Sequence, residues 1–409
     1  PSKILGLREE YFQKVAAAHA LGKIANGHAA GLSGRELEAY LCGGLSDDHE
    51  CVDYDEALER LRLGLPIFVR EGSTERNLEP IIRGVVEGNL DTRHLMFCTD
   101  DKHPDDILDE GHIDYMINKS IEIGLDPVTA IQMATVNAAV HFRIDGRLGS
   151  LTPGRWADIV LTESLDRIVP THVFHQGDLA ARDGELILEP EDVTYPAWFS
   201  STVEVTSGIR AEDFRLEHQG PEARVRVIDL YPEQIINEVE EAALPVVEGS
   251  VRGDIEQDVL KVAVVERYGK NGNIGISFVK GFGMKRGAIA SSVAHDHHNI
   301  IVAGTNERDM ACCIRAVQDM KGGLVVAADD QVLGKMPLPL GGLMAQISAR
   351  EAIKALEEIT GIYHQLGGTL PAPFMTISFI SLPTVPEFGL TDKGLVNVRE
   401  HRLISPFVE

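Results

Sequence analysis

The sequence predicts an α/β protein whose N-terminal part is built from repeated strand–helix units. Short apolar runs alternate with helical patterns over residues 1–145, and such repeats favour parallel strands joined by right-handed crossovers. The 409 residues are 44% hydrophobic and 25% charged, which suits two or three domains with sizeable cores. A barrel and an open doubly wound sheet both fit this pattern.

The elements expected within residues 1–145 follow in order. The chain starts with an amphipathic, helix-like segment over residues 1–10. Ser33 and Glu36 have the spacing of a capping box, which predicts a helix that ends near Cys42. From apolar periodicity, we expect strands or short strand-like segments at 22–27, 45–49, 65–70 and 94–99, and helices at 53–63, 77–86, 105–123 and 127–141.

Composition divides the rest of the chain into three regions. Residues 146–190 are rich in turn residues and β-like runs, with a hairpin expected at Asp183-Gly184. Residues 191–222 are polar and irregular, as in a linker. In the last region, 223–409, we expect strands at 225–230, 260–265, 274–279, 288–294 and 300–303, and helices at 307–320 and 348–356.

The charge of the chain excludes some partners. Lys and Arg number 38 and Asp and Glu number 63, giving a net charge of −25. A negative field repels phosphate groups, so we expect neither nucleic acid nor an anionic membrane as a partner. The five cysteines have no paired spacing, which is typical of reduced thiols, and no apolar run approaches the ~20 residues of a membrane span. We therefore expect a cytoplasmic protein.

Polar residues end three of the expected strands: His28, His49 and Asp100. An eight-unit barrel of ~250 residues uses ~31 residues per unit, so His49 follows His28 after about one unit and Asp100 follows after about two. Active sites of such barrels lie at the carboxyl ends of the strands. Two imidazoles and a carboxylate suit Zn, Mn or Fe. The alternative is that each residue is a surface or capping residue.

The sequence around these residues resembles the amidohydrolase superfamily and, within it, the adenine deaminase family. The motifs nearest the expected site are Asn26-Gly27-His28-Ala29-Ala30-Gly31-Leu32, Asp47-Asp48-His49-Glu50 and Cys98-Thr99-Asp100-Asp101-Lys102-His103-Pro104. Further similar motifs are Arg70-Glu71-Gly72-Ser73, Pro153-Gly154-Arg155-Trp156-Ala157-Asp158, Val293-Ala294-His295-Asp296-His297-His298-Asn299, Pro337-Leu338-Pro339-Leu340 and Ser381-Leu382-Pro383. The resemblance runs over nearly the whole chain.

The resemblance implies a particular domain organisation. Residues 1–145 would form the second half of a (β/α)8 TIM-type barrel, strands 5–8. Residues 146–190 would be part of a small β-sandwich, and residues 191–222 a linker. Residues 223–409 would form a C-terminal α/β domain with a mixed sheet, of the type peculiar to adenine deaminases.

The resemblance also implies metal-dependent hydrolysis of adenine to hypoxanthine and ammonia. His28 would be the strand-5 metal ligand and His49 the strand-6 ligand. Asp100, at the end of strand 8, would bind metal and accept the proton of the attacking water, whose pKa a metal lowers. Glu50 is a candidate for proton transfer to the purine ring nitrogen and the leaving amine, or else a helix-entry carboxylate. The expected cofactor is a divalent metal, two ions of Mn or Fe, with Zn as a further option.

Other residues are weaker candidates for the substrate site. Arg70 and Ser73, after the expected strand 7, could face the substrate. Asp101 could orient the purine ring, or else pair with a neighbouring cation. His295 and His298, in a dense imidazole cluster, could line the site or bind a second metal, and solvated imidazoles at a strand end are the alternative.

One departure from the family pattern concerns the start of the chain. The superfamily has an HxH metal-binding pair on strand 1, and this family has a Glu ligand on strand 4, but neither precedes His28 here. The only HxH triplet, His295-Asp296-His297, lies far downstream. We therefore expect this chain to be the C-terminal part of a protein of ~600 residues, with the N-terminal half supplied in cis or in trans.

Two other functions remain open from the sequence. The protein could be another cyclic amidohydrolase, which opens an amide ring without releasing ammonia. It could also be a non-catalytic half-barrel subunit that needs a partner chain. For the adenine deaminase interpretation, we expect a homodimer with adenine as its small-molecule substrate.

Overall fold

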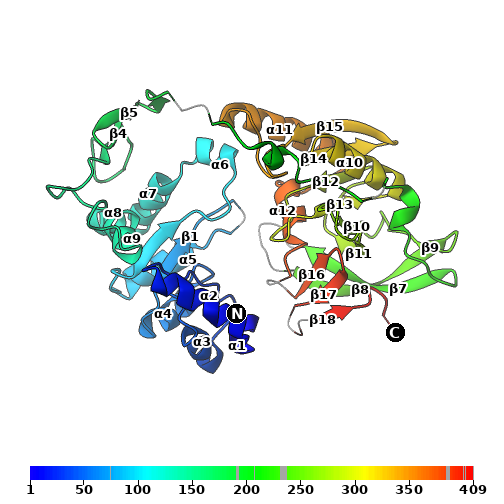
Figure 1. Cartoon of the computed structure of the whole chain (residues 1–409), viewed down its shortest axis with the longest axis horizontal. Coiled ribbons are helices and arrows are strands. Elements are labelled where there is room, and N and C mark those ends of the chain that lie inside the picture. The colour runs from blue at the N-terminus through cyan, green and yellow to red at the C-terminus, as the bar shows by residue number, and fades with distance from the viewer. Residues whose placement is uncertain are drawn as a thin grey trace. The chain divides into compact units, whose positions relative to one another are not determined.

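The computed structural model describes residues 1–73, 75–189, 193–206, 208–230, 237–383, 387–398, 400 and 402–408. The chain forms two compact units, Pro1–Asp192 and Val193–Glu409. Figure 1 labels helices and strands of each unit. Each unit is described by itself below. Within the described residues, no helix combines the length and the apolar character that a membrane span needs.

The first unit contains the parallel strands that the sequence predicts. Strands β1 and β2 pair in parallel, and Asp48 forms a further parallel bridge with Ile67. Apolar residues of these strands and of neighbouring helices pack in one buried cluster that includes Ile81, Phe97 and Met116. The elements, in order, are α1 (Ser2–Leu5), α2 (Glu9–Ala20), α3 (Gly34–Leu41), α4 (Tyr54–Arg62), β1 (Ile67–Arg70), α5 (Leu78–Glu87), β2 (Leu95–Cys98), α6 (Pro104–Asp109), α7 (Ile113–Ile123), α8 (Pro127–Ala134) and α9 (Val136–His141).

The predicted strand at residues 22–27 is wrong, because this segment is extended without a strand ladder. Side chains of the neighbouring segment take the N–H groups that a ladder would use. Ala25 N–H donates to Ser46 Oγ at 3.2 Å, and Gly27 N–H donates to Asp47 Oδ1 at 3.0 Å. One backbone bond, from Ser46 N to the Ala25 carbonyl at 2.8 Å, still holds the two segments side by side.

The predicted capping box at Ser33 is also wrong, although the helix begins where expected. Ser33 is the N-cap of α3 but makes no side-chain capping bond. Gly34 has a φ of 52°, a left-handed conformation that glycine adopts without strain. Its N–H donates instead to Glu59 Oε1 at 2.8 Å. A carboxylate from α4 therefore ties down the start of α3.

Two helices expected as single elements are each divided. The segment predicted at 105–123 forms α6 and α7, separated around Gly111, whose φ of 111° is incompatible with a continuing helix. The segment predicted at 127–141 forms α8 and α9, which meet at Thr135, where φ is −129° and ψ is −88°. Apolar periodicity continues across both breaks, so it could not reveal them.

The first unit ends in a small antiparallel sheet of order β3-β4-β5-β6. Its strands are β3 (Ile159–Leu161), β4 (His172–His175), β5 (Asp178–Arg182) and β6 (Glu185–Leu186). The predicted hairpin is confirmed, since Arg182 pairs with Glu185 around Asp183 and Gly184. Both turn residues have positive φ, 49° and 82°, as a type I′ turn requires.

The second unit is built on one mixed sheet of order β15-β14-β12-β13-β10-β11-β7-β8-β9. Only β11 and β7 pair in parallel, and the other pairs are antiparallel. The strands of this sheet are β7 (Glu222–Leu230), β8 (Asn237–Val247), β9 (Ser250–Val251), β10 (Val259–Val265), β11 (Ile274–Lys280), β12 (Ala288–Ser291), β13 (Ile300–Gly304), β14 (Gly323–Ala328) and β15 (Gln331–Pro337).

The five strands and two helices predicted in this region are present. They correspond to β7, β10, β11, β12 and β13 and to the helices α10 (Glu307–Asp319) and α11 (Ala349–Gln365). The sequence interpretation missed β8, β9, β14 and β15. It also missed η1 (Ala197–Ser200), η2 (Ala211–Phe214), α12 (Pro373–Phe379) and the separate sheet of β16 (Phe388–Thr391), β17 (Gly394–Asn397) and β18 (Arg402–Ile404). The parallel pair of the first unit and this mixed sheet confirm the α/β class.

The segment expected as a linker contributes to the core of the second unit. Val203, Val205, Ile209 and Phe214 are buried in a cluster with the strands and with α10. Phe214 has 0% exposure. The polar composition of residues 191–222 therefore conceals four apolar residues that pack on the sheet.

Two helix-interior glycines give a matched test of this packing. A Cβ on Gly84, in α5, would lie 2.2 Å from Tyr54 Cγ, whereas a Cβ on Gly361, in α11, meets nothing within 4 Å. We expect Gly84→Ala to destabilise the protein by ~1–3 kcal/mol through overpacking. Gly361→Ala should stabilise it by ~0.5–1 kcal/mol through helix propensity. Urea unfolding followed by circular dichroism checks both, and a Gly84→Ala variant as stable as the parent would contradict this packing.

Candidate metal centre

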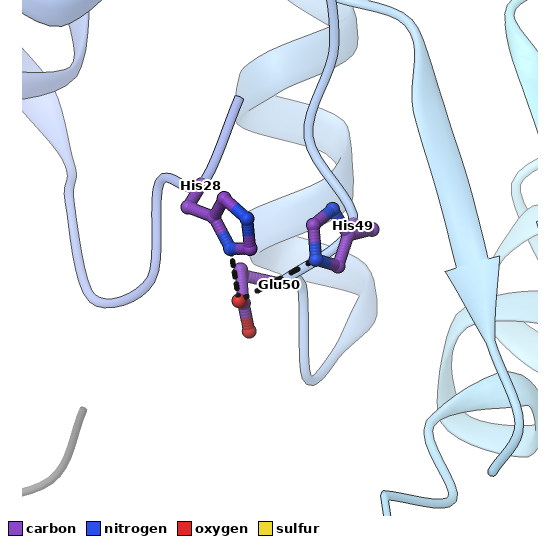
Figure 2. A group of neighbouring side chains, drawn as sticks. All are labelled: His28, His49 and Glu50. Carbon is purple, nitrogen blue, oxygen red and sulfur yellow. Dashed lines mark hydrogen bonds and ion pairs between the residues drawn. The ribbon is translucent and has the colours of Figure 1, made fainter. Parts of the chain in front are cut away.

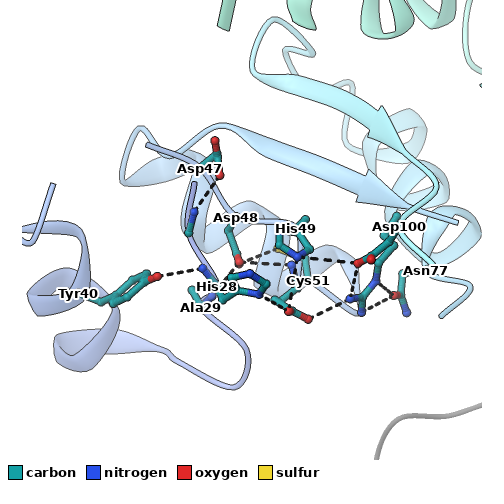
Figure 3. A network of polar contacts seen from close by, with 12 residues as sticks. His28, Ala29, Tyr40, Asp47, Asp48, His49, Cys51, Asn77 and Asp100 are labelled. Atoms are coloured by element: carbon teal, nitrogen blue, oxygen red, sulfur yellow. Dashed lines mark hydrogen bonds and ion pairs between the residues drawn. The ribbon is translucent and has the colours of Figure 1, made fainter. Parts of the chain in front are cut away.

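The residues predicted at strand ends lie together in the first unit. His28 follows the extended segment, His49 follows the residue that bridges to β1, and Asp100 lies two positions after β2. The carboxyl ends of parallel strands meet at the same edge of a sheet. Figure 3 shows His28, His49 and Asp100 in one continuous network of polar contacts.

The shortest contacts in the cluster centre on Glu50. Glu50 Oε1 lies 2.8 Å from His28 Nδ1 and 3.6 Å from His49 Nε2, as Figure 2 shows. His49 Nε2 lies 3.8 Å from Asp100 Oδ2. The two imidazole rings meet edge to face, with their centroids 4.3 Å apart. Two imidazoles and two carboxylates thus face one another.

This arrangement suits a divalent metal ion. Ligand atoms of His28, His49 and Glu50 all lie within 4.8 Å of one another. Metal–ligand bonds of about 2.0–2.2 Å place neighbouring ligand atoms roughly 3–4 Å apart, and the distances from Glu50 Oε1 to His28 Nδ1 and His49 Nε2, 2.8 and 3.6 Å, are close to that range. Imidazole nitrogen and carboxylate oxygen are also the ligands that Zn, Mn and Fe accept. Glu50 therefore joins the histidines and Asp100 as a residue that could hold the metal, a role that the sequence did not suggest.

The pKa of Glu50 follows from its surroundings. Burial alone raises the pKa of this carboxyl, but the hydrogen bond with His28 and the positive charge of Arg70 outweigh burial, and His49 adds to them. The pKa is lowered to about 2. Glu50 is therefore a carboxylate at neutral pH in this arrangement.

A fully buried ion pair supports the backbone segment that carries His49. Arg60 Nε donates to Asp48 Oδ2 at 2.6 Å, and neither side chain is exposed. Asp48 Oδ1 accepts from Ala29 N–H at 2.8 Å and from Glu50 N–H at 3.3 Å. Arg60 Nη2 donates to the Ala29 carbonyl at 2.7 Å. One aspartate and one arginine thus fix the backbone that carries both candidate histidines, and Figure 3 shows Asp48 beside His28 and His49.

A second buried aspartate holds the His28 segment. Asp47 Oδ1 accepts from Gly27 N–H at 3.0 Å, and Asp47 Oδ2 contacts His141 Nε2 at 2.7 Å. The N–H of His28 donates to the Tyr40 hydroxyl at 2.9 Å. Tyr40 of α3 and His141 of α9 therefore help to position His28, whose own segment is not held in a strand ladder.

The other candidates of the first unit have structural contacts. Arg70, the last residue of β1, is only 4% exposed and contacts both Glu50 and Asp100. Ser73 donates to Asp106 Oδ2, and its hydroxyl accepts from His103 N–H at 2.8 Å. The carbonyl of Asp101 accepts from Ser73 N–H at 3.0 Å. Ser73 and Asp101 thus join the loop after β1 to the loop after β2.

His295 and His298 belong to the second unit. The His295 ring stacks on Phe379 with centroids 4.8 Å apart, and His295 Nδ1 lies 3.1 Å from Ser378 Oγ. Its centroid lies 5.8 Å from that of His298. Burial, aided by the nearby charges of His295 and Arg267, lowers the pKa of His298. Neither belongs to the group of candidate metal ligands found among the described residues.

Sequence reasoning missed the residues that support the site, namely Arg60, Asn77, Tyr40 and His141. Arg60, Tyr40 and His141 lie in helices and Asn77 directly precedes α5, and nothing in their local pattern distinguishes them from surface residues. The one available signal was the pair Asp47-Asp48, because two adjacent carboxylates before His49 need buried partners if the segment is a strand end.

Comparisons with known proteins define the class and then the family. The amidohydrolase family matches residues 7–202, and the adenine deaminase C-terminal domain matches residues 234–402. The first match places the metal-site candidates of the first unit within an amidohydrolase. A protein named adenine deaminase from Desulforamulus reducens is 52% identical over 409 residues, covering 100% of this chain and 70% of that protein. The chain belongs to the adenine deaminase family.

A second relative has the same name and is also longer than this chain. The adenine deaminase of Methanococcoides burtonii is 40% identical over 388 residues, covering 94% of this chain and 65% of that protein. Relatives are thus longer than this chain. A crystal structure of a beta-aspartyl dipeptidase from Fervidobacterium islandicum AW-1 is 21% identical, with a TM-score of 0.36 over 45% of this chain and 56% of that chain. That likeness is too weak to inform the site.

The Asp48–Arg60 pair provides a stability test. Asp48→Asn leaves the Arg60 guanidinium buried without its counter-charge, so we expect a loss of ~3–5 kcal/mol in the free energy of unfolding. Glu79→Gln is the control, because Glu79 pairs with Arg83 on the surface, with side chains 51% and 56% exposed. That change should cost under ~1 kcal/mol. Equal losses in urea unfolding would refute the support role of Asp48.

Proposed function

We propose that this chain carries the C-terminal part of an adenine deaminase, including part of its catalytic metal site, with His28, His49 and Asp100 as metal ligands. The observation that supports the activity is the full-length match to a protein named adenine deaminase at 52% identity. The observation that supports the site is the meeting of these three residues and Glu50 at the ends of neighbouring strand segments.

The proposed reaction is the hydrolysis of adenine to hypoxanthine and ammonia. A bound divalent metal would supply Lewis acidity, which lowers the pKa of a water molecule towards neutrality. Asp100 accepts a proton from the attacking water as the bond from its oxygen to C6 of the purine forms. Glu50, which starts ionised, would receive the proton that the water released and deliver it to the ring nitrogen, and would then carry the proton of the hydroxyl on C6 to the departing amine. One hydrogen of the water ends on the ring nitrogen and the other on ammonia when the C6–N bond breaks.

The contacts of Glu50 favour this proton role over the alternative of a helix-entry carboxylate. Glu50 lies before α4, but the N-cap of that helix is Asp53, whose side chain accepts from Glu56 N–H at 3.0 Å. Glu50 faces His28 and His49 instead. Its ionised state at neutral pH allows it to receive a proton before it donates one.

The finer description of the protein belongs to the same proposal. Residues 1–145 would be the second half of a (β/α)8 barrel, 146–190 part of a β-sandwich and 223–409 the C-terminal domain, whose core also contains Val203, Val205, Ile209 and Phe214. The remaining barrel strands would come from the N-terminal half, which the greater length of the relatives favours. Two ions of Mn or Fe, or Zn, would fit the ligands. A cytoplasmic homodimer is proposed, and the five free cysteines agree with a reducing compartment.

Substitution of the proposed ligands tests this function. In the complete gene product, His28→Ala, His49→Ala and Asp100→Asn should each lower ammonia release from adenine at least ~100-fold, because each removes a metal ligand. Metal content per protomer should fall with activity, while the thermal unfolding midpoint stays close to that of the parent. His175→Ala is the control, since His175 is an exposed residue of β4.

Two results would contradict the proposal. Full turnover in any of the three variants would remove that residue from the site. Ring opening of a cyclic amide by the parent protein, without ammonia release from adenine, would show that the substrate is wrong and would favour another cyclic amidohydrolase.

A further inference from the structure

The Arg70 side chain links the two carboxylates of the candidate metal centre. Arg70 Nη1 donates to Glu50 Oε2 at 3.0 Å and to Asp100 Oδ2 at 3.3 Å. The Arg70 side chain is 5% exposed and that of Glu50 is 8% exposed. The two acids follow different strand segments. A single nitrogen of Arg70 therefore connects the carboxyl ends of these two segments.

The opposite edge of the same guanidinium is also fixed. Arg70 Nε and Nη2 donate to Asn77 Oδ1 at 3.3 and 3.2 Å. Asn77 is the residue before α5, and its N–H donates to the Arg70 carbonyl at 3.2 Å. Asn77 therefore contacts both the backbone and the side chain of Arg70. Such a clamp limits the rotation of a long side chain.

The bridge that Arg70 makes between Glu50 and Asp100 has an electrostatic reason. Glu50 and Asp100 both accept from one nitrogen, so the two carboxylates are close neighbours, and like charges in one site disfavour each other's ionised forms. Arginine stays protonated at all relevant pH values. Its permanent charge therefore compensates one of the two negative charges before any metal is bound.

The bridge also determines which oxygen faces which partner. Arg70 engages Oε2 of Glu50, and Oε1 is the atom that faces His28 and His49. Arg70 has few polar groups left for a substrate, because three of its atoms already donate to protein oxygens. This differs from the interpretation of Arg70 as a residue that faces the substrate.

We propose that Arg70, clamped by Asn77, is a positioning residue that holds the Asp100 carboxylate in the orientation that binds the metal and keeps the Glu50 carboxylate facing the two histidines. This inference rests on the proposed function for the identity of the ligands, but not for the substrate. It predicts that Arg70 influences metal affinity and turnover and leaves adenine binding nearly unchanged. A lysine cannot replace it, because one ammonium cannot reach two carboxylates and Asn77 in a planar fork.

The test compares Arg70→Gln, Arg70→Lys and Asn77→Leu in the complete gene product. Mn²⁺ is titrated into metal-depleted protein, and free Mn²⁺ is followed by electron paramagnetic resonance. We expect Arg70→Gln to weaken Mn²⁺ affinity 10–100-fold, the usual effect of losing an outer-shell partner. Arg70→Lys and Asn77→Leu should each weaken it about 3–10-fold. In the loaded enzymes, kcat should fall while KM for adenine changes less than about twofold.

Arg83→Gln is the matched control, since Arg83 is an exposed arginine of α5 that forms a surface ion pair with Glu79. It should behave as the parent in both assays. Asn77→Leu keeps the arginine and its charge, so it remains informative if Arg70→Gln does not fold.

Unchanged Mn²⁺ affinity in both Arg70→Lys and Asn77→Leu would overturn the inference. A raised KM with unchanged kcat would also overturn it, because that pattern belongs to a residue that contacts the substrate. The Mn²⁺ titration does not use adenine. Failure of the parent to deaminate adenine would therefore count against the proposed function while the role of Arg70 is still decided.

Discussion

The buried ion pair between Asp48 and Arg60 is the interaction on which the candidate site depends most. Two opposite charges with 0% exposed side chains are tolerated only when their remaining hydrogen-bonding groups are satisfied. Here those groups bind the backbone of Ala29, Leu32, Glu50 and Glu56. The cost of burying the pair is thus offset by contacts that fix the segments carrying His28, His49 and Glu50.

The contacts of the site form successive layers from the core outwards. Asp48 and Arg60 hold the backbone, Arg70 and Asn77 hold the carboxylates, and the imidazoles complete the cluster. The first two of these layers each pair an arginine with acids near the ends of strand segments. Glu50 stays ionised although burial opposes it, since His28, Arg70 and His49 together lower its pKa. A cluster of imidazoles and carboxylates held by such contacts suits a divalent cation.

The sequence predicted the strand ends better than their surroundings. His28, His49 and Asp100 were found because βα units have a regular length, and the structure brings them together. The capping box next to Gly34 and the continuous helix across Gly111 were wrong predictions. Both glycines have positive φ values, which apolar periodicity does not reveal. The strands β14 and β15 were missed because they are paired only with distant segments or with each other. Arg60 carries no local signal, since it binds the carbonyls of Ala29 and Leu32 far along the chain, and the contact between Asn77 and Arg70 follows from the loop between β1 and α5, which no periodicity predicts.

A crystal structure of the manganese-loaded complete gene product, with anomalous scattering data at the manganese edge, tests the central claim most directly. The account predicts an anomalous peak within bonding distance of His28, His49 and Asp100, with Arg70 still contacting Glu50. Peaks confined to other places, such as the His295 cluster of the second unit, would contradict it. So would a peak that the imidazoles of His28 and His49 do not contact.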